Sequence, residues 1–387
     1  MNVNSKNPSF LIVPDSFKDS LSAKNVGKNI AAGIKQIFNK SAVKIIPMAD
    51  GGEGTVDSIV YAAGGEIIKT TVEDALGRPT ESFFGIINNG KTAIIEMAAA
   101  SGIEKLNLQE RNPWITSTYG TGQLIKAALD KNCKEIIIGI GGSATNDAGV
   151  GMAMALGAKF TDKNGNTIKK GGGFLKDIVD IDLSQFDNRI NNVKIIAATD
   201  VTAPLTGKNG ASFVFAPQKG ASPEMVTKLD NNLKHFANIV KAKFNIDIDN
   251  IAGSGAAGGL GAGLFFFLHA KIESGFSVIA KLTSVEDEIS NYDIIITAEG
   301  KVDSQTETGK TPVGVALLAQ KFNKPVFVFT GNATEKTDEL YKQGITSLIP
   351  ITRKPCKLNE ALLNADIWLQ KSAEELCIAI KMGLDLS

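Results

Sequence analysis

Acidic side chains, lysines and glycines lie at the ends of three apolar runs, at residues 9–15, 42–48 and 292–299. Each run is typical of a short buried strand and precedes a predicted helix. Ligands of open α/β sheets bind beyond the carboxyl ends of such strands, where helix N-termini favour anions. From these segments we select Asp15, Lys18, Asp50, Gly51, Gly52, Glu299, Gln305 and Lys310. Carboxylates can hold Mg²⁺, and lysines neutralise phosphate charge, so this set suits a magnesium-bound polyphosphate.

Helix capping is the alternative explanation for each of these acids taken singly, because Asp and Ser often occupy the residue before a helix. We favour capping for Asp19 and Ser22, which precede the predicted helix at 22–38. The convergence of Asp15, Asp50 and Glu299 on strand ends favours a ligand site instead.

The middle of the chain carries comparable segments. The sequence "GIGGSATNDAGVG" (139–151) places Gly141, Gly142, Ser143 and Asp147 on a predicted strand-to-helix turn. Asp200 ends another apolar run, and Lys219 lies in "APQKGA". Further glycine clusters occur at 49–54, 169–174 and 253–263, and together the clusters favour a phosphorylated ligand. Tight turns and close packing remain the alternative for any one cluster, and Asp147 is equally well explained as a turn residue.

The segment "DSQTETGKTPVG" (303–314) resembles the phosphate-binding loop G-x-x-x-x-G-K-[ST] but departs from it twice. Ser304 stands where that loop needs its first glycine. Pro312 has no backbone N–H to donate and suits the first position of a helix. We therefore predict a helix entry here, from which Lys310 could still reach an anion.

Composition excludes several classes of protein. The 387 residues carry 41 Lys and Arg against 41 Asp and Glu, so no overall field attracts nucleic acid or an acidic membrane. The three cysteines are far apart, which argues against a disulfide framework or structural zinc site. We find no signal peptide and no apolar stretch long enough to span a bilayer. A cytoplasmic protein that acts on a small molecule is expected, and a homo-oligomer is compatible with this.

The predicted elements that position these residues fall into two groups. Near the chain ends, about five strands alternate with helices, which predicts a doubly wound parallel α/β sheet built from residues 1–65 and 286–387. Residues 66–285 are predicted to form a second α/β domain inserted into the first. Its expected strands lie in 77–98, with a turn at 88–90, and in "KEIIIGIGG", "KIIAATDV" and "ASFVFAP" (211–217). A single long helix is expected over 359–383.

Long motifs of the chain resemble the bacterial glycerate kinase family. They are "LIVPDSFKDSLSA", "PMADGGEGTVD", "IEMAAASG", "TSTYGTGQLI", "IIIGIGGSATNDAGVGMAMALGA", "ATDVTAPL", "FAPQKGA", "GSGAAGGLGAGL" and "EGKVDSQTETGKTPVGVA". The resemblance implies ATP-dependent phosphorylation of D-glycerate with Mg²⁺, in a flavodoxin-like domain plus a discontinuous α/β domain with a cleft between them. Where the family usually has Gly-Glu-Gly-Arg, this chain has Ala298 to Lys301, and the loss of bidentate geometry puts a substrate-clamping role at 301 in doubt.

Chemistry then suggests a role for each candidate. We assign catalysis to Asp200, Lys18 and Asp15, nucleotide binding to Gly141, Gly142, Ser143, Lys310, Gly51 and Gly52, substrate binding to Arg78, Lys219, Asp147 and Gln305, and metal binding to Asp50 and Glu299. Asp200 would orient or deprotonate the glycerate hydroxyl, and Arg78 or Lys219 would bind the carboxylate. The resemblance favours 2-phosphoglycerate as product, although the less hindered C3 hydroxyl would give 3-phosphoglycerate. A non-catalytic two-lobed binding protein, and a lyase or isomerase of hydroxy acids, are the alternatives from other classes.

Overall fold

The computed structural model describes residues 7–49, 51–302, 311–333 and 338–386. The chain divides into two compact units. The first contains residues 1–50, 61–63 and 276–387, and the second contains residues 51–60 and 64–275. The chain therefore passes from one unit to the other near residues 50–64 and again at 275–276. The sequence had predicted these boundaries slightly later, at 65–66 and 285–286.

A five-stranded parallel sheet forms the centre of the first unit, in the order β13-β12-β11-β1-β2. Its strands are β1 (Phe10–Pro14), β2 (Val43–Ile45), β11 (Ile294–Val302), β12 (Val326–Ala333) and β13 (Ser347–Pro350). Counted along the unit, the strand order is 2-1-3-4-5, which is the flavodoxin-like order with its switch point between β1 and β11. The predicted doubly wound sheet is confirmed.

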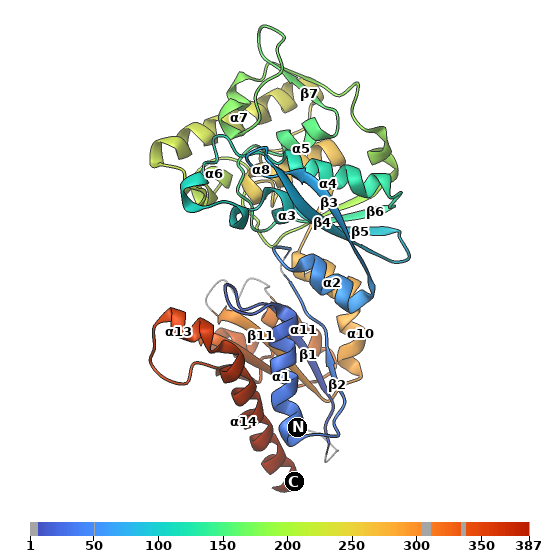
Figure 1. Cartoon of the computed structure of the whole chain (residues 1–387), viewed down its shortest axis with the longest axis vertical. Helices are drawn as coiled ribbons and strands as arrows, with labels where there is room; N and C mark the ends of the chain where they lie inside the picture. Colours follow the sequence, from blue (N-terminus) through green and yellow to red (C-terminus); the bar gives the residue numbers. More distant parts are fainter. Residues whose placement is uncertain (1–6, 50, 303–310, 334–337, 387) are drawn as a thin grey trace. The chain divides into compact units, whose positions relative to one another are not determined.

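Helices cover both faces of this sheet (Figure 1). They are α1 (Ala23–Ile37), α10 (Val285–Ser290), α11 (Thr311–Gln320), α12 (Asp338–Lys342), α13 (Leu358–Leu363) and α14 (Ala365–Leu386), and α9 (Gly275–Leu282) begins at the boundary between the units. Because side chains alternate along a strand, Phe10 and Ile12 of β1 pack with α1 and α14, which lie side by side. Helices α10 and α11 also contact β1. The single helix expected over 359–383 is divided at Asn364 into α13 and α14.

The second unit has a six-stranded mixed sheet in the order β10-β9-β6-β5-β4-β3. Its strands are β3 (Gly65–Glu73), β4 (Pro79–Ile87), β5 (Thr92–Glu96), β6 (Glu135–Gly139), β9 (Lys194–Ala198) and β10 (Lys271–Glu273), and β7 (Lys159–Thr161) pairs with β8 (Asp180–Asp182) in a small separate sheet. Strands β5, β6, β9 and β10 run parallel, so their carboxyl ends share one edge. The predicted turn between β4 and β5 has positive φ at Asn88, Asn89 and Gly90, as its Asn-Asn-Gly sequence favours.

Helices and short 3₁₀ turns complete the second unit. The helices are α2 (Thr55–Ala63), α3 (Ala98–Ser101), α4 (Tyr119–Asp130), α5 (Val150–Ala155), α6 (Ala211–Phe215), α7 (Pro223–Phe244) and α8 (Ala256–Leu268). The 3₁₀ turns are η1 (Ile103–Lys105), η2 (Leu108–Glu110), η3 (Gly172–Asp177), η4 (Asn188–Asn192) and η5 (Pro217–Lys219).

One strand prediction in this unit was wrong, because residues 211–215 form helix α6. Ala211 and Ser212 are buried, whereas Phe213 and Val214 are exposed. A short apolar run between glycine and proline does not distinguish a strand from a buried helical turn by periodicity. The helix directs Ser212 inward, where its hydroxyl accepts a hydrogen bond of 3.0 Å from the Asn146 amide.

Candidate active site

In the first unit, Asp15 directly follows β1 and lies beside the neighbouring strand β11, which contains Glu299. The Asp15 backbone N–H donates to the Ala298 carbonyl at 2.9 Å, which places Asp15 beside the next residue of β11, Glu299. The Asp15 carboxylate accepts hydrogen bonds from the Thr311 hydroxyl at 2.8 Å and the Ser16 N–H at 2.7 Å. It thus joins the end of β1 to the start of α11 across the switch point. Of the other acids and lysines predicted for this edge, Asp50 and Lys310 lie outside the described residues, as does Gln305.

Glycines allow backbones to come unusually close at the same edge. A Cβ on Gly300 would lie 3.3 Å from the Cα of Phe17 and 3.5 Å from the Lys18 nitrogen. A Cβ on Gly331, near the end of β12, would lie 2.6 Å from the Gly300 carbonyl oxygen. Lys18 is exposed on the loop after β1, and Lys301 is also exposed. The edge therefore combines two carboxylates with an exposed lysine and close backbone spacing, the features from which the sequence predicted a magnesium-bound polyphosphate.

In the second unit, the loop that begins at Gly51 packs directly on the ends of β6 and β9. Gly51 has φ +88°, and its Cβ would lie 2.6 Å from the Ala198 carbonyl oxygen. The Gly141 N–H donates to the Gly51 carbonyl at 3.0 Å, and a Cβ on Gly141 would lie 2.8 Å from the Gly52 Cα. Close backbone packing accounts for these glycines, which is the alternative that the sequence left open beside a phosphate cradle.

Asp200 follows β9 at the same edge. One carboxylate oxygen, Oδ1, accepts hydrogen bonds from the Ser274 hydroxyl at 2.7 Å and the Gly275 N–H at 3.0 Å. Both donors follow β10, the neighbouring parallel strand. The half-buried carboxylate is therefore held in one orientation by two fixed donors, as a positioned base requires.

A buried polar cluster occupies the turn after β6. Lys219 is 2% exposed, and its amine donates to the Ser143 hydroxyl at 2.7 Å and to the Thr145 carbonyl at 2.8 Å. Burial lowers the pKa of Lys219 to about 7, although the charge of Asp147 favours the protonated form. Lys219 therefore contacts this turn rather than solvent. To bind a substrate carboxylate directly, as the sequence predicted, its amine would have to become exposed.

Asp147 is fully buried and serves the local backbone. Its Oδ2 accepts hydrogen bonds from the Thr118 N–H at 2.8 Å, the Thr118 hydroxyl at 3.0 Å and the Ser117 hydroxyl at 3.2 Å. Burial raises the pKa of Asp147, and the hydrogen bonds from Thr118 oppose that rise. The bonds from Thr118 and Ser117 tie the turn to the start of α4. The bonds from the Gly149 and Gly151 N–H groups, each at 3.3 Å, are those of a turn residue, the second explanation that the sequence offered.

Arg78 is engaged by two carboxylates on the turn after β3. Its Nε donates to Asp74 at 2.6 Å, and its Nη1 donates to Glu110 at 2.5 Å. These hydrogen bonds, first that with Glu110 and then that with Asp74, raise the pKa of Arg78. The guanidinium is therefore already neutralised, which makes Arg78 a weaker candidate for substrate binding than its sequence position suggested.

Glu96, at the end of β5, is a buried acid that we did not select from the sequence. It is 2% exposed, and its Oε1 accepts a hydrogen bond of 2.6 Å from the Val56 N–H in the first turn of α2. The sequence did contain an indication of this residue: Glu96 ends the apolar run "TAIIE" and follows the first isoleucine of the motif "IEMAAASG". Burial raises the pKa of Glu96 to about 7, and the hydrogen bond from Val56 opposes that rise.

We expect Glu96→Gln to change how stability depends on pH. A carboxyl whose pKa is 4.5 when unfolded and about 7 when folded binds its proton more tightly in the folded state. Its contribution is therefore complete below pH 4.5 and is lost as the pH rises to 7, by on the order of 3 kcal/mol. Thermal unfolding between pH 5 and 7.5 should show a flatter dependence of Tm for Glu96→Gln than for wild type. The same substitution at exposed Glu104 should leave the wild-type slope, and identical slopes for wild type and Glu96→Gln would contradict the assignment.

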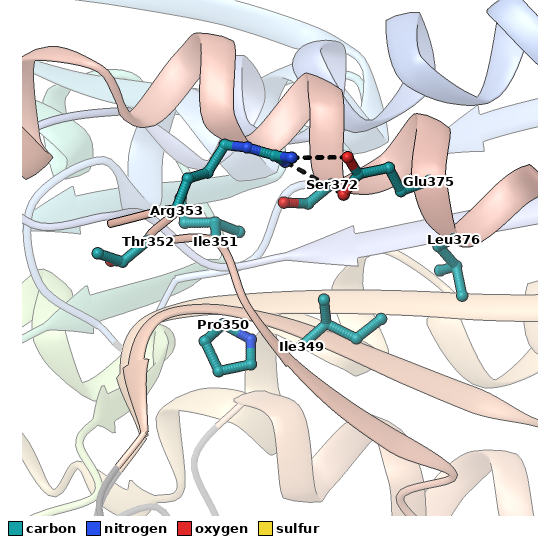
Figure 2. A pocket seen from close by; sticks show the side chains of 8 residues that line it. All are labelled: Ile349, Pro350, Ile351, Thr352, Arg353, Ser372, Glu375 and Leu376. Carbon is teal, nitrogen blue, oxygen red and sulfur yellow. Dashed lines mark hydrogen bonds and ion pairs between the residues drawn. The ribbon is translucent and has the colours of Figure 1, made fainter. Parts of the chain in front are cut away.

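A pocket of about 290 Å³ lies beside β13 and α14 in the first unit. Figure 2 shows its apolar residues Ile349, Pro350, Ile351 and Leu376 together with Thr352, Arg353, Ser372 and Glu375. The Arg353 guanidinium donates two hydrogen bonds to the Glu375 carboxylate, at 2.6 and 3.1 Å. Because this charge is paired and none of the predicted site residues lines the pocket, we assign no ligand to it.

Comparison with known proteins identifies the family. The family model described as "Glycerate kinase family" matches residues 10–381. The chain belongs to the glycerate kinase family. It is 43% identical to a glycerate kinase of Bacillus subtilis (strain 168), over 96% of this chain and 98% of the relative. Identity to the glycerate 2-kinase of Escherichia coli (strain K12) is also 43%, over 97% and 98% of the two chains.

A solved structure agrees with this assignment. A Salmonella typhimurium LT2 protein assigned as glycerate kinase 2 superposes with a TM-score of 0.86 at 41% identity, over 98% of this chain and 99% of the other. As a member of the glycerate kinase family, the protein is a kinase. None of the helices in the described part of the chain is both long and apolar enough to cross a membrane.

Proposed function

We propose that this kinase transfers the γ-phosphoryl group of ATP to the C2 hydroxyl of D-glycerate, which gives 2-phosphoglycerate and ADP. The observation that carries this proposal is the nearly full-length similarity to the Escherichia coli relative, which is named a glycerate 2-kinase. Chemistry supports the choice of hydroxyl. A site that binds the carboxylate holds the adjacent C2 hydroxyl in place, whereas the C3 hydroxyl keeps one more free rotation.

In the proposed reaction, the C2 oxygen forms a bond to the γ-phosphorus while the bond from that phosphorus to the β–γ bridging oxygen breaks. Asp200 orients the C2 hydroxyl and accepts its proton, because its carboxylate is already fixed by Ser274 and Gly275. Lys18, which is exposed on the loop after β1, neutralises phosphate charge. Catalysis thus depends on positioning and charge rather than on a covalent intermediate.

The residues of the first unit fit a magnesium site. Among the described residues, no group of three or more His, Cys, Asp or Glu side chains is arranged to hold a metal ion. Mg²⁺ does not require one, because it commonly takes one or two carboxylates together with phosphate oxygens and water. Asp15, which follows β1, lies beside Glu299 of the neighbouring strand β11, and the two provide such carboxylates. When bound, Mg²⁺ would neutralise the negative charge that develops on the transferred phosphoryl group.

A coupled assay tests the proposed product. The purified protein with ATP, Mg²⁺ and D-glycerate should form ADP only when glycerate is present. Enolase without phosphoglycerate mutase should then give a signal, because enolase uses 2-phosphoglycerate. A signal that appears only after mutase is added would identify the product as 3-phosphoglycerate. No glycerate-dependent ADP from a folded protein would contradict the activity itself.

A further inference from the structure

Lys219 fixes the hydrogen-bonding direction of Ser143. The amine is almost wholly buried, and its two described acceptors are the Ser143 hydroxyl at 2.7 Å and the Thr145 carbonyl at 2.8 Å. A carbonyl can only accept, and an ammonium group can only donate. Burial lowers the pKa of Lys219 to about 7 and the charge of Asp147 opposes that shift, so the ammonium form is present at and below about pH 7. In that form, Ser143 Oγ must be the acceptor of the bond to Lys219.

The hydroxyl hydrogen of Ser143 is then left for another acceptor. A serine hydroxyl has one hydrogen, and the bond from Lys219 uses one of its lone pairs. Within the described residues, Ser143 Oγ takes part only in the bond from Lys219, so no acceptor for this hydrogen is found there. The hydrogen is therefore directed away from the Lys219 amine and remains available to a ligand.

The backbone holds Ser143 firmly at the carboxyl end of β6. Ser143 forms an isolated antiparallel bridge with Gly102, and the neighbouring N–H of Ala144 donates to the Ser101 carbonyl at 3.0 Å. The Ile103 N–H donates to the Gly142 carbonyl at 2.9 Å. The hydroxyl is therefore fixed at a strand end, where ligands of parallel sheets bind.

Two further polar atoms of this turn have no hydrogen-bond partner in the described part of the chain. Thr145 Oγ1 and Asn146 Oδ1 are fully buried, and neither has a hydrogen-bond partner among the described residues. Buried polar atoms without a partner are costly and are uncommon in a turn that serves only the fold. Their presence beside Lys219 indicates a turn that binds polar groups other than those of the described residues.

We propose that Lys219 is a positioning residue, which holds Ser143 as an acceptor so that Ser143 donates its hydrogen to an anionic oxygen of a substrate. This inference rests on the proposed function, in which two anions bind: the carboxylate of D-glycerate and the phosphates of ATP. Either could be the acceptor. Lys219 itself contacts neither, which agrees with its burial.

A double-mutant cycle tests the inference through the separate KM values for D-glycerate and ATP. Ser143→Ala should raise one of the two KM values by about tenfold or more, the loss expected for a hydrogen bond to a charged acceptor. Lys219→Met, similar in length but without donors, should raise the same KM by a similar factor. The double variant should be no worse than the more impaired single variant, because both remove one interaction. Which KM rises identifies the anion.

Other outcomes would overturn the inference. If the KM of the double variant rose by the product of the two single-variant factors, Lys219 would act independently of Ser143. The same conclusion would follow if Ser143→Ala raised the KM for one substrate and Lys219→Met raised the KM for the other. Lys219→Gln keeps an amide that can donate a hydrogen bond, so its KM should lie between those of wild type and Lys219→Met. If neither Lys219 variant folds, Ser143→Ala alone decides, because wild-type KM values for both substrates would refute the proposal. The proposed function is tested separately, by whether the wild-type enzyme phosphorylates D-glycerate at either hydroxyl. If it does, unchanged KM values in the variants count against this inference alone.

Discussion

Replacing Asp200 by asparagine is expected to lower kcat about 10²–10⁴-fold, the usual cost of losing a positioned base, while the fold stays intact. The amide oxygen of asparagine can accept the same hydrogen bonds that Asp200 Oδ1 accepts from Ser274 and Gly275. The side chain therefore keeps its shape and orientation and loses its charge and basicity. Steady-state ADP formation and thermal unfolding, measured on the same preparation, separate these effects.

Matched variants make the result for Asp200 specific. Asp182→Asn removes a charge from an exposed residue of the same unit and should leave kcat near wild type. Ser274→Ala removes one of the two donors that orient Asp200, so kcat should fall by less than it does for Asp200→Asn. If Asp200→Asn reduced kcat by less than about tenfold, the role of base would move to Asp15, which is held in a similar way by Thr311 and Ser16.

The architecture of the first unit follows directly from local pattern. Its central strands are buried on both faces, so they form continuous apolar runs such as "FLIVP" of β1, whereas β2 and β13 at the edges are partly exposed. The same reasoning failed for residues 211–215, where an apolar run of similar length forms α6. The difference lies in tertiary contacts, since the hydrogen bond from Asn146 to Ser212 draws one side of the helix inward. A pattern within one segment does not contain that information.

The candidate site was predictable where chemistry depends on position along a strand. Asp15 and Asp200 directly follow β1 and β9, because parallel strands share an edge, and that rule needs only the strand assignment. Glu299 instead pairs with Thr330 inside β11, which continues to Val302, beyond the predicted end at 299. Burial and pairing were not predictable. Arg78 and Lys219 are both basic residues near turns, yet Arg78 is held by two carboxylates and Lys219 is enclosed by a polar turn. These differences arise from residues distant in the sequence, as does the burial of Glu96 against α2.

The glycine cluster at 253–263 illustrates a pattern whose cause lies in packing. Three successive residues inside α8, Ala257, Gly258 and Gly259, have positive φ and interrupt the helix. The Gly258 carbonyl accepts a hydrogen bond of 3.1 Å from the Ala148 N–H. This interruption lets the segment fit closely against the turn that follows β6, which contains Thr145 and its neighbours.

Gly258→Ala is therefore expected to destabilise the protein strongly. A Cβ at this position would lie 2.0 Å from the Thr145 carbonyl oxygen and 2.6 Å from the Asn146 Cα, and both are backbone atoms that cannot rotate away. The residue also has φ +67°, which L-residues rarely adopt. Together these effects should lower the free energy of unfolding by about 3 kcal/mol or more. For a unit of this size, that corresponds to a fall in Tm of roughly 6–12 °C.

Gly207→Ala is the matched control, because it separates the two causes. Gly207 has φ +88°, but nothing lies within 4 Å of the position of its Cβ. Its substitution should cost only the backbone strain, about 1 kcal/mol. At a temperature where both variants are folded, Gly258→Ala should also raise the KM that Ser143→Ala raises, because it displaces the Thr145 carbonyl to which Lys219 is bonded. Equal losses of stability in the two glycine variants would show that φ alone matters at Gly258 and that contact with the turn does not.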